Sequence, residues 1–204
     1  MEEKKKQDQM AALMNAIFAE SMRGYRLQPK LGISRKYKFR DAMVDERICE
    51  PCFDAYGRVF PAETAPTTQE IRRRSHPFCR CRIEWLRSIQ AGTATVSGDN
   101  GADYAVKQTG HLPERYLSKE KAIEKGWINQ RGNLWEILPG ISLYEEHKNR
   151  KKKLPTKQGR TWYEADINYH GGYRNTQRLL FSDDGLIFVT YDHYQTYFEI
   201  GTVK

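Results

Sequence analysis

Apolar residues early in the chain recur with the period of a helix. Within residues 9–22 the apolar positions fall at helical spacing: Met10, Leu13, Met14, Ile17 and Phe18. Two shorter helical patterns lie at about 102–109 and about 118–125. The second begins at Ser118, a residue type that caps helix N-termini. We therefore predict a helix in each of these segments.

The pattern changes to that of strands between Arg160 and Ile200. These strands are separated by turn signals: "HGG" at 170–172, "DDG" at 183–185 and the Asp192-His193 corner. No strand is predicted in the preceding stretch, 139–159, which is rich in Gly, Pro and Lys. Helices followed by a run of strands predict an α+β fold, with the helices packed on an antiparallel sheet.

A change of composition separates two parts of the chain. Residues 88–101, "SIQAGTATVSGDNG", are small and polar and include three glycines. Such a segment buries too little apolar area to order itself, which predicts a flexible linker. The linker divides the chain into a front region, residues 1–87, and a helix-and-strand domain, residues 102–204.

Charge adds a class of partner to this picture. The chain has a formal net charge of +8 and a pI of about 9.3. This balance favours an anionic partner, whether nucleic acid, an acidic membrane face or an acidic protein; a well-solvated surface is the alternative explanation. No window approaches the roughly 18 apolar residues of a membrane span. The start, "MEEKKKQDQM", has no apolar region behind it, so we expect no signal peptide.

One predicted strand combines an acid with two nearby arginines. In "TWYEADINYHGGYRNTQR", residues 161–178, alternation places Glu164 on a polar face and Tyr163 on an apolar face. A three-residue loop at 170–172 would set Glu164 opposite Arg178 and bring Arg174 to the same face. A two-residue loop would send both arginines to the other face.

These residues suit the cleavage of RNA, whose 2′-OH is an internal nucleophile. Glu164 suits the base that takes the 2′-OH proton, and His193 suits the acid that protonates the leaving 5′-oxygen. Arg174 and Arg178 suit the phosphate, because guanidinium binds it bidentately. The mechanism requires no metal. The plain alternative is a cross-strand ion pair of about 0.2–1 kcal/mol, with His193 in a structural role.

Residues from about 102 to 200 resemble the barnase and binase type of microbial ribonucleases. The segments that carry the resemblance occur in the family's order: "HLPERYLSKEKAIEKGW", "GNLWEILPG", "KLPTKQGRTWYEADINY", "GYRNTQRLLFSDDGLIFVT" and "DHYQTYFEI". The resemblance implies Glu164 as general base, His193 as general acid and Arg174 and Arg178 as phosphate ligands. It also implies that Lys119 helps to hold the scissile phosphate.

The same resemblance implies a base-recognition site. Asn149 and Arg150 match the family's base-recognition loop, and Tyr194 matches an aromatic residue that lines the base site. The family places a carboxylate directly after the Asn-Arg pair to read guanine, but this chain has Lys151 there. A lysine has no acceptor for the guanine N–H groups, so cleavage is expected without an assured guanine preference. Two nearby acids are alternative acceptors: Glu145 and Glu146.

All four cysteines lie in the front region. Cys49 and Cys52, followed by Cys79 and Cys81, have the spacing of a structural zinc site, in which His76 is an alternative ligand. Two disulfides and free thiols are the other interpretations. In each of these interpretations the cysteine region is structural, and the proposed RNA cleavage itself needs no cofactor.

Residues from about 41 to 86 resemble the C-terminal part of phage Mu protein F-like head morphogenesis domains. The resemblance is carried by "DERICEPCFDAYGRVFP" followed by "HPFCRC". Because prophage-derived versions of that domain carry toxins behind it, it implies a polymorphic toxin with phage-head or delivery-machinery partners. We expect delivery by a phage-like or secretion route and action in the target-cell cytoplasm.

The function that follows is a metal-independent endoribonuclease toxin. Its expected substrate is single-stranded RNA, since a splayed base must enter the pocket. Its expected products carry 2′,3′-cyclic phosphate ends. The ribonuclease resemblance implies a second partner, an acidic barstar-like immunity protein that covers the active site. The alternatives are a phage structural protein whose nuclease-like domain is inactive, and a module that binds nucleic acid without cutting it.

Overall fold

The structure of the protein is a computed structural model that describes residues 35–39, 59–60, 64–74 and 81–201. Its front part contains a small antiparallel sheet with the strand order β2-β1-β3 and one helix that contacts β3. The elements are β1 (Arg35–Phe39), β2 (Val59–Phe60), α3 (Thr68–Arg74) and β3 (Cys81–Trp85). The helix predicted over residues 9–22 lies outside the described residues.

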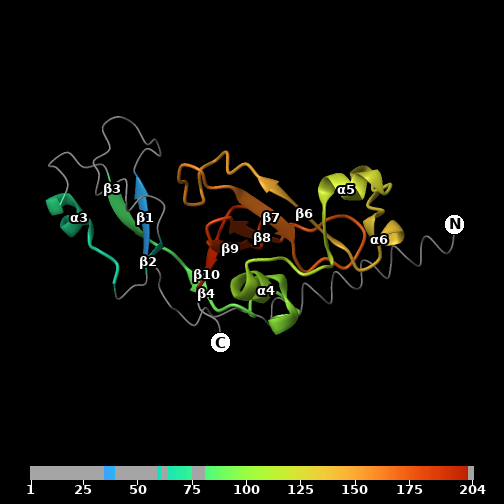
Figure 1. Cartoon of the computed structure of the whole chain (residues 1–204), viewed down its shortest axis with the longest axis horizontal. Coiled ribbons are helices and arrows are strands. Elements are labelled where there is room, and N and C mark those ends of the chain that lie inside the picture. Colours follow the sequence, from blue (N-terminus) through green and yellow to red (C-terminus); the bar gives the residue numbers. More distant parts are fainter. Residues whose placement is uncertain (1–34, 40–58, 61–63, 75–80, 202–204) are drawn as a thin grey trace.

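A seven-stranded sheet forms the centre of the second part (Figure 1). Its strand order is β4-β10-β9-β8-β7-β6-β5. The strands are β4 (Ser88–Ile89), β5 (Tyr116–Ser118), β6 (Ser142–His147), β7 (Trp162–Asp166), β8 (Arg178–Ser182), β9 (Ile187–Thr190) and β10 (Phe198–Ile200). The predicted antiparallel pairing is confirmed from β7 to β10, and it extends to β6, which was not predicted as a strand. Both edge pairs, β4/β10 and β5/β6, are parallel. A helical crossover joins β5 to β6, which is the connection that a parallel pair requires.

Both helices predicted in the second part are confirmed. They are α4 (Ala102–Thr109) and α5 (Lys119–Glu124), followed by the short helix α6 (Leu134–Ile137). The Ser118 side chain caps α5 by accepting a hydrogen bond from the Lys121 N–H, at 3.4 Å. Single 3₁₀ turns precede α4 and α6: η1 (Gly98–Asn100) and η2 (Asn129–Arg131).

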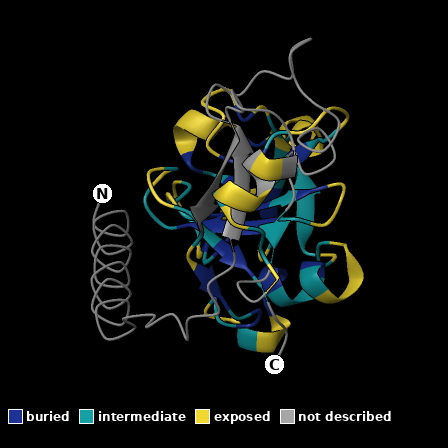
Figure 2. Ribbon diagram, turned by 90° about the vertical axis from the view of Figure 1, so that its left-hand side faces the viewer, coloured by how far each residue is buried: buried dark blue, intermediate teal, exposed yellow. Residues whose placement is uncertain are grey.

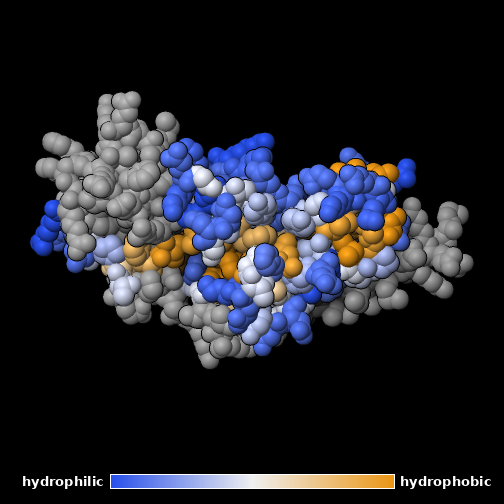
Figure 3. Space-filling view, viewed as in Figure 1, coloured by the Kyte–Doolittle hydropathy of each residue, from blue (hydrophilic) through white to orange (hydrophobic). Residues whose placement is uncertain are grey.

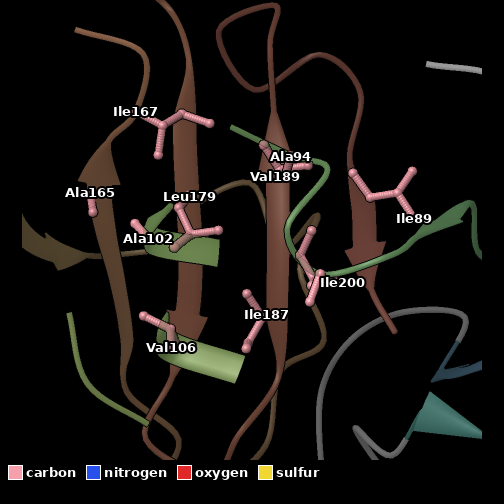
Figure 4. Close-up of a cluster of buried hydrophobic side chains, with 11 residues drawn as sticks. Ile89, Ala94, Ala102, Val106, Ala165, Ile167, Leu179, Ile187, Val189 and Ile200 are labelled. Carbon is pink, nitrogen blue, oxygen red and sulfur yellow. The ribbon is translucent and has the colours of Figure 1, made fainter. Parts of the chain in front are cut away.

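The main core lies between α4 and one face of the large sheet. Leu179 of β8 lies over Ala102 of α4, and Val189 of β9 lies beside Ala94 (Figure 4). Ala165 and Ile167 from the β7 segment and Val106 of α4 belong to the same buried cluster. Figure 2 shows the same arrangement as a buried sheet interior beneath largely exposed helices and loops. The alternation predicted for residues 162–169 is confirmed as far as Ile167, with Ala165 and Ile167 on the apolar face. Tyr169 was predicted on the same face, but it packs in a separate cluster with Trp127, Leu134 and Leu143.

Strand β6 lies within the stretch for which no strand was predicted. Its sequence is "SLYEEH", in which two adjacent acids, Glu145 and Glu146, interrupt the alternation of apolar and polar residues. The sequence of this segment alone has only a weak period-two pattern. Its strand conformation therefore depends on pairing with β5 and β7.

The segment predicted as a flexible linker differs from that prediction. Ser88 and Ile89 form β4 and pair with β10, and Ala91 and Ala94 are buried in the main core. Short apolar side chains suffice here, because they fill space between the edge of the sheet and α4. Residues 88–101 are thus part of the packed domain.

A buried aspartate fastens this segment to α4. Asp103 is 0% exposed and accepts hydrogen bonds from the backbone N–H groups of Gly92 (2.7 Å) and Ala94 (3.0 Å) and from the Thr95 hydroxyl (3.0 Å). These bonds supply the acceptors that a buried loop needs for its backbone.

Surface character differs between the loops and the short helices. Hydrophilic residues cover the loop that joins β6 to β7, whereas hydrophobic residues show over α5 and α6 (Figure 3). The exposed apolar residues there are Ile123, Ile128, Trp135 and Ile137. In the part of the chain that the structure describes, no helix is long and apolar enough to cross a membrane.

Replacing Asp103 by alanine tests the role of residues 88–101. We expect Asp103→Ala to lower the free energy of unfolding by about 3 kcal/mol, because the backbone N–H groups of the buried Gly92 and Ala94 and the part-buried Thr95 hydroxyl lose their acceptor. Glu124→Ala, which removes an exposed acid from α5, is expected to change it by less than about 0.5 kcal/mol. Urea denaturation measures both. Equal stability of the two variants would show that the segment is a linker after all.

Candidate active site

Polar residues form a band across the sheet face opposite α4. Strand register places Glu145 of β6 beside Glu164 of β7, and Asp166 of β7 beside Arg178 of β8, which pairs in turn with Thr190 of β9. Apolar clusters flank the band. One contains Leu154, Trp162, Leu180 and Phe188, and the other contains Ala122, Trp127, Leu134, Leu143 and Tyr169. Charged groups therefore lie in a partly desolvated strip where their interactions are strong.

The predicted register of the two central strands needs a correction. Glu164 lies opposite Leu180, and Arg178 lies opposite Asp166, so the pairing is shifted by two residues from the predicted one. The connection is a long loop rather than a three-residue turn. Asn168 has a positive φ of 54° and takes the chain out of the ladder. A shift of two preserves the face, so Arg178 still shares a face with Glu164.

The loop from 167 to 177 replaces the predicted tight turn because its residues pack elsewhere. Tyr169 is buried beside Trp135, with the two ring centroids 5.8 Å apart, whereas Tyr173, which a three-residue loop at 170–172 would place opposite it, is 71% exposed. The side-chain amide of Asn175 donates to the carbonyl oxygens of Ile167 and Asn168, at 2.9 Å each. The loop is thereby closed through side-chain contacts.

Asp166 holds both arginines. Its carboxylate is 0% exposed and accepts two hydrogen bonds from Arg174, from Nε at 2.8 Å and from NH2 at 2.9 Å. The Nε of Arg178 lies 3.0 Å from the same carboxylate as an ion pair, although its hydrogen is not aligned for a hydrogen bond. Burial lowers the pKa of Arg174, but the hydrogen bonds and charges of Asp166 and Glu145 outweigh it and raise that pKa above its usual range.

Glu164 is buried and hydrogen-bonded on both oxygens. Nδ1 of His147 lies 2.5 Å from its Oε2, and the Tyr194 hydroxyl lies 2.9 Å from each oxygen. The Nε of Arg178 is 4.0 Å from Oε1. Burial raises the pKa of Glu164, but the hydrogen bonds from His147 and Tyr194 and the charges of His147 and Arg178 prevail and hold the pKa below its usual value. Glu164 is thus an ionised carboxylate at neutral pH.

His193 lies at the edge of this group. It is exposed on the loop between β9 and β10, where it and Tyr194 adopt positive φ angles of 56° and 67°. Its ring centroid lies 5.0 Å from that of Tyr194, whose hydroxyl reaches Glu164. The structure therefore brings His193 to the same side of the sheet as Glu164, with Tyr194 between them.

Lys119 and Glu145 complete the charged group. Nζ of Lys119, at the start of α5, lies 2.9 Å from Oε2 of Glu145, and NH1 of Arg174 lies 3.4 Å from Oε1. Glu145 had been considered only as an alternative base-reading acid. Its carboxylate is instead the shared counter-ion of two predicted phosphate ligands.

The predicted base-recognition loop leaves the end of β6. Asn149, which is buried with a φ of 40°, exchanges two hydrogen bonds with the backbone of Leu154, at 3.0 and 3.2 Å, and so closes the loop. Arg150 and Lys151 are exposed on it. A pocket of about 320 Å³ lies against the loop, with a basic lining that includes Lys148, Arg150, Lys152, Lys157 and Arg160.

A larger pocket, of about 800 Å³, lies on the opposite face of the sheet. It is lined by Val106 and Leu112 on one side and by Tyr144, Tyr163 and Phe181 on the other. Strand alternation separates it from Glu164, which points to the other face. Size alone therefore does not identify the reactive site.

The predicted zinc ligands fall almost entirely outside the described residues. This holds for Cys49, Cys52, His76 and Cys79, and for Cys81 the structure gives only its place in the backbone of β3. Among the residues described, no three His, Cys, Asp or Glu side chains gather in a way that could hold a metal ion. The zinc site stays a prediction.

His147 was missed by the sequence analysis, as was the role of Glu145. Both project from β6, the strand that was not predicted. Had residues 142–147 been assigned as a strand, the alternation of Leu143, Glu145 and His147 would have placed both polar residues on the face of Glu164.

The fold and the site define a class: a small α+β enzyme domain with an ionised glutamate, a histidine, a lysine and two arginines on one face of its sheet. The chain is 46% identical over 103 residues to a ribonuclease from Heyndrickxia coagulans, a match that covers 50% of this chain and 94% of that one. It is also 46% identical to ribonucleases from Bacillus intermedius and Bacillus pumilus, and each of these matches covers 50% of this chain and 63% of the relative. A family model for ribonuclease matches residues 99–201.

The chain belongs to this ribonuclease family, and the matched domain is an endoribonuclease of the barnase and binase type. The match begins within the segment that had been predicted as a linker, in agreement with the packing of that segment. It does not extend to the front region.

Removing the charge of Asp166 should destabilise the fold strongly. We expect Asp166→Asn to lower the free energy of unfolding by about 3–5 kcal/mol, because it leaves two largely buried guanidiniums without their shared carboxylate. Glu146→Gln, which breaks the exposed pair with Lys148, should lower it by less than about 1 kcal/mol. Thermal and urea unfolding of the two variants measure the difference. Similar values for both would contradict the anchoring role of Asp166.

Proposed function

We propose that this endoribonuclease cleaves single-stranded RNA without a metal, by attack of the 2′-oxygen on the adjacent phosphorus. The observation that carries the proposal is the buried, ionised Glu164 with His193 and three cations around it. RNA brings its own nucleophile, so the protein has to supply a base, an acid and positive charge.

In the proposed reaction Glu164 takes the proton of the 2′-OH. The 2′-oxygen forms a bond to phosphorus while the bond from phosphorus to the 5′-oxygen breaks. His193 gives its proton to that leaving oxygen, which yields a 2′,3′-cyclic phosphate and a 5′-hydroxyl end. The depressed pKa of Glu164 supports the base role, since it leaves the carboxylate ready to accept a proton at neutral pH.

The cations are proposed to stabilise the charge that grows on phosphorus. Asp166 accepts hydrogen bonds from one edge of the Arg174 guanidinium. The remaining N–H groups of Arg174, together with N–H groups of Arg178, are assigned to the phosphate. Lys119 is assigned to the scissile phosphate, in competition with Glu145, its partner in the free protein. Tyr194 is assigned to the base site, where its ring offers a stacking surface.

The basic loop bears on the choice of base. Asn149 and Arg150 are assigned to base recognition, while Lys151 stands where the family places a carboxylate. The lysines of this loop add phosphate attraction that is independent of sequence, so salt should weaken binding steeply.

We further infer that the enzyme is a toxin held in check by a small acidic inhibitor. The formal charge of +8 and the cluster of Lys119, Arg174 and Arg178 support an acidic partner. The resemblance of residues 41–86 to phage head morphogenesis domains supports delivery by a phage-like route to a target cell. Failure of every acidic protein made by the same organism to protect RNA from this chain would count against the inhibitor.

Product analysis with and without the base tests the reaction. A short single-stranded RNA in EDTA should give 2′,3′-cyclic phosphate ends with the unmodified protein, and Glu164→Gln should lower kcat by about 10²–10⁴-fold. Mass spectrometry identifies the ends, and circular dichroism confirms that the variant is folded. A folded, unmodified protein that binds RNA without cutting it would favour a binding module instead.

Restoring an acid to the base-recognition loop tests the second assignment. Lys151→Glu should raise kcat/KM for substrates cut after guanine by about 10–100-fold relative to those cut after adenine, because a carboxylate accepts from the guanine N–H groups. Lys152→Glu makes the same change of charge at the next residue and should not alter the ratio. An unchanged ratio in Lys151→Glu would show that Lys151 does not control the preference for guanine.

A further inference from the structure

The shortest polar contact of Glu164 is made by a residue to which neither the sequence nor the relatives assign a role. His147 ends β6, and its Nδ1 lies 2.5 Å from Oε2 of Glu164. Both side chains are largely buried, at 18% and 10% exposed. The imidazole therefore contacts the carboxylate away from bulk water, where such a contact is strong.

The bonding pattern fixes which partner donates. An ionised carboxylate can only accept, so Nδ1 of His147 carries the hydrogen. The ring is held in this orientation by stacking on Tyr194, with the centroids 5.4 Å apart and the planes inclined by 27°. Tyr194 also donates to Glu164, so the three side chains form one closed group.

We propose that His147 is a positioning residue for the base: its Nδ1–H keeps the Glu164 carboxylate oriented and ionised, so that RNA cleavage extends to more acidic pH than a buried carboxyl would otherwise allow. The inference rests on the proposed function, because it assigns a role through Glu164. His147 itself does not exchange a proton with the substrate in this account.

The direction of the effect follows from what surrounds Glu164. Burial alone raises the pKa of this carboxyl, and His147 is the leading influence that opposes it, ahead of Tyr194 and Arg178. When His147 is removed, less opposes the effect of burial, so the pKa of Glu164 rises. The other ionisable groups around the pair are Glu145 on β6, Asp166 on β7, Arg174 on the 167–177 loop, Arg178 on β8, and His193, Tyr194 and Tyr197 on the loop after β9.

Tyr194 and Tyr197 do not contribute to the acid limb of the pH profile of kcat/KM. Burial and the charge of Glu164 raise the pKa of Tyr194 and of Tyr197 further above neutrality, so both stay as hydroxyls. His193 is the proposed acid, which gives its proton to the leaving 5′-oxygen. The acid limb then reports the ionisation of Glu164, which must be a carboxylate to take the 2′-OH proton.

The test is the pH dependence of kcat/KM on a short single-stranded RNA. His147→Phe retains a ring that can stack on Tyr194 but has no N–H, and its acid limb should move to higher pH by about 1–2 units. His147→Gln keeps a hydrogen-bond donor without the charge, so its acid limb should lie between those of the unmodified protein and His147→Phe. His111→Phe changes an exposed histidine on the far side of the sheet and should follow the unmodified protein.

Proton NMR supplies a readout that is independent of turnover. The unmodified protein should show a downfield resonance from the Nδ1–H of His147, and it should be lost in both His147→Phe and Glu164→Gln. This measurement stands even if one variant folds poorly, because the resonance is observed in the unmodified protein.

Two results would overturn the inference, and they are distinguishable. If the unmodified protein cleaves, Glu164→Gln does not, and His147→Phe retains the original acid limb, His147 has no such role while the proposed function stands. If the folded, unmodified protein does not cleave RNA at all, the proposed function fails and the inference falls with it.

Discussion

The completely buried carboxylate of Asp166 is the constraint on which the rest of the site depends. A charge with no access to water must be paired, and here it is paired with two arginines from different parts of the chain. Arg178 belongs to the adjacent strand, but Arg174 comes from the long loop. The ion pair therefore fixes the loop as well as the charge. Through Arg174 it reaches Glu145, and through Glu145 it reaches Lys119 on α5.

This arrangement explains how so much positive charge is held beside the Glu164 carboxylate. Asp166 and Glu145 neutralise part of the arginine and lysine charge, so the cations can be desolvated together. Glu164 then lies next to cations whose principal partners are other acids. Its pKa is depressed chiefly by hydrogen bonds from His147 and Tyr194, and less by Arg178 at 4.0 Å. The cations thus lie near Glu164 while their principal ion pairs are with Asp166 and Glu145.

Strand parity made much of this predictable from the sequence. The alternation around Glu164 identified its face correctly, and the helices at 102–109 and after Ser118 have the predicted positions. The register was wrong by two residues, yet the conclusion for Arg178 survived because parity is unchanged. What failed were features that depend on tertiary contacts. Because the period-two pattern of β6 is weak, His147 could not be placed on a strand face from the sequence. The small residues of 88–101 do not indicate locally that Asp103 and pairing with β10 would order them.

The loop after β9 shows why the position of a histidine was harder to predict than its chemistry. His193 and Tyr194 are consecutive non-glycine residues with positive φ, a conformation that persists only when neighbours enforce it. The enforcement is local: the Thr190 hydroxyl accepts from the Tyr194 N–H, and Asp192 accepts from the N–H groups of Gln195 and Thr196. The bend aims the Tyr194 hydroxyl at Glu164 and leaves His193 exposed. A regular strand would have sent these adjacent side chains to opposite faces, so the bend is what allows both to lie on the side of the sheet that carries Glu164.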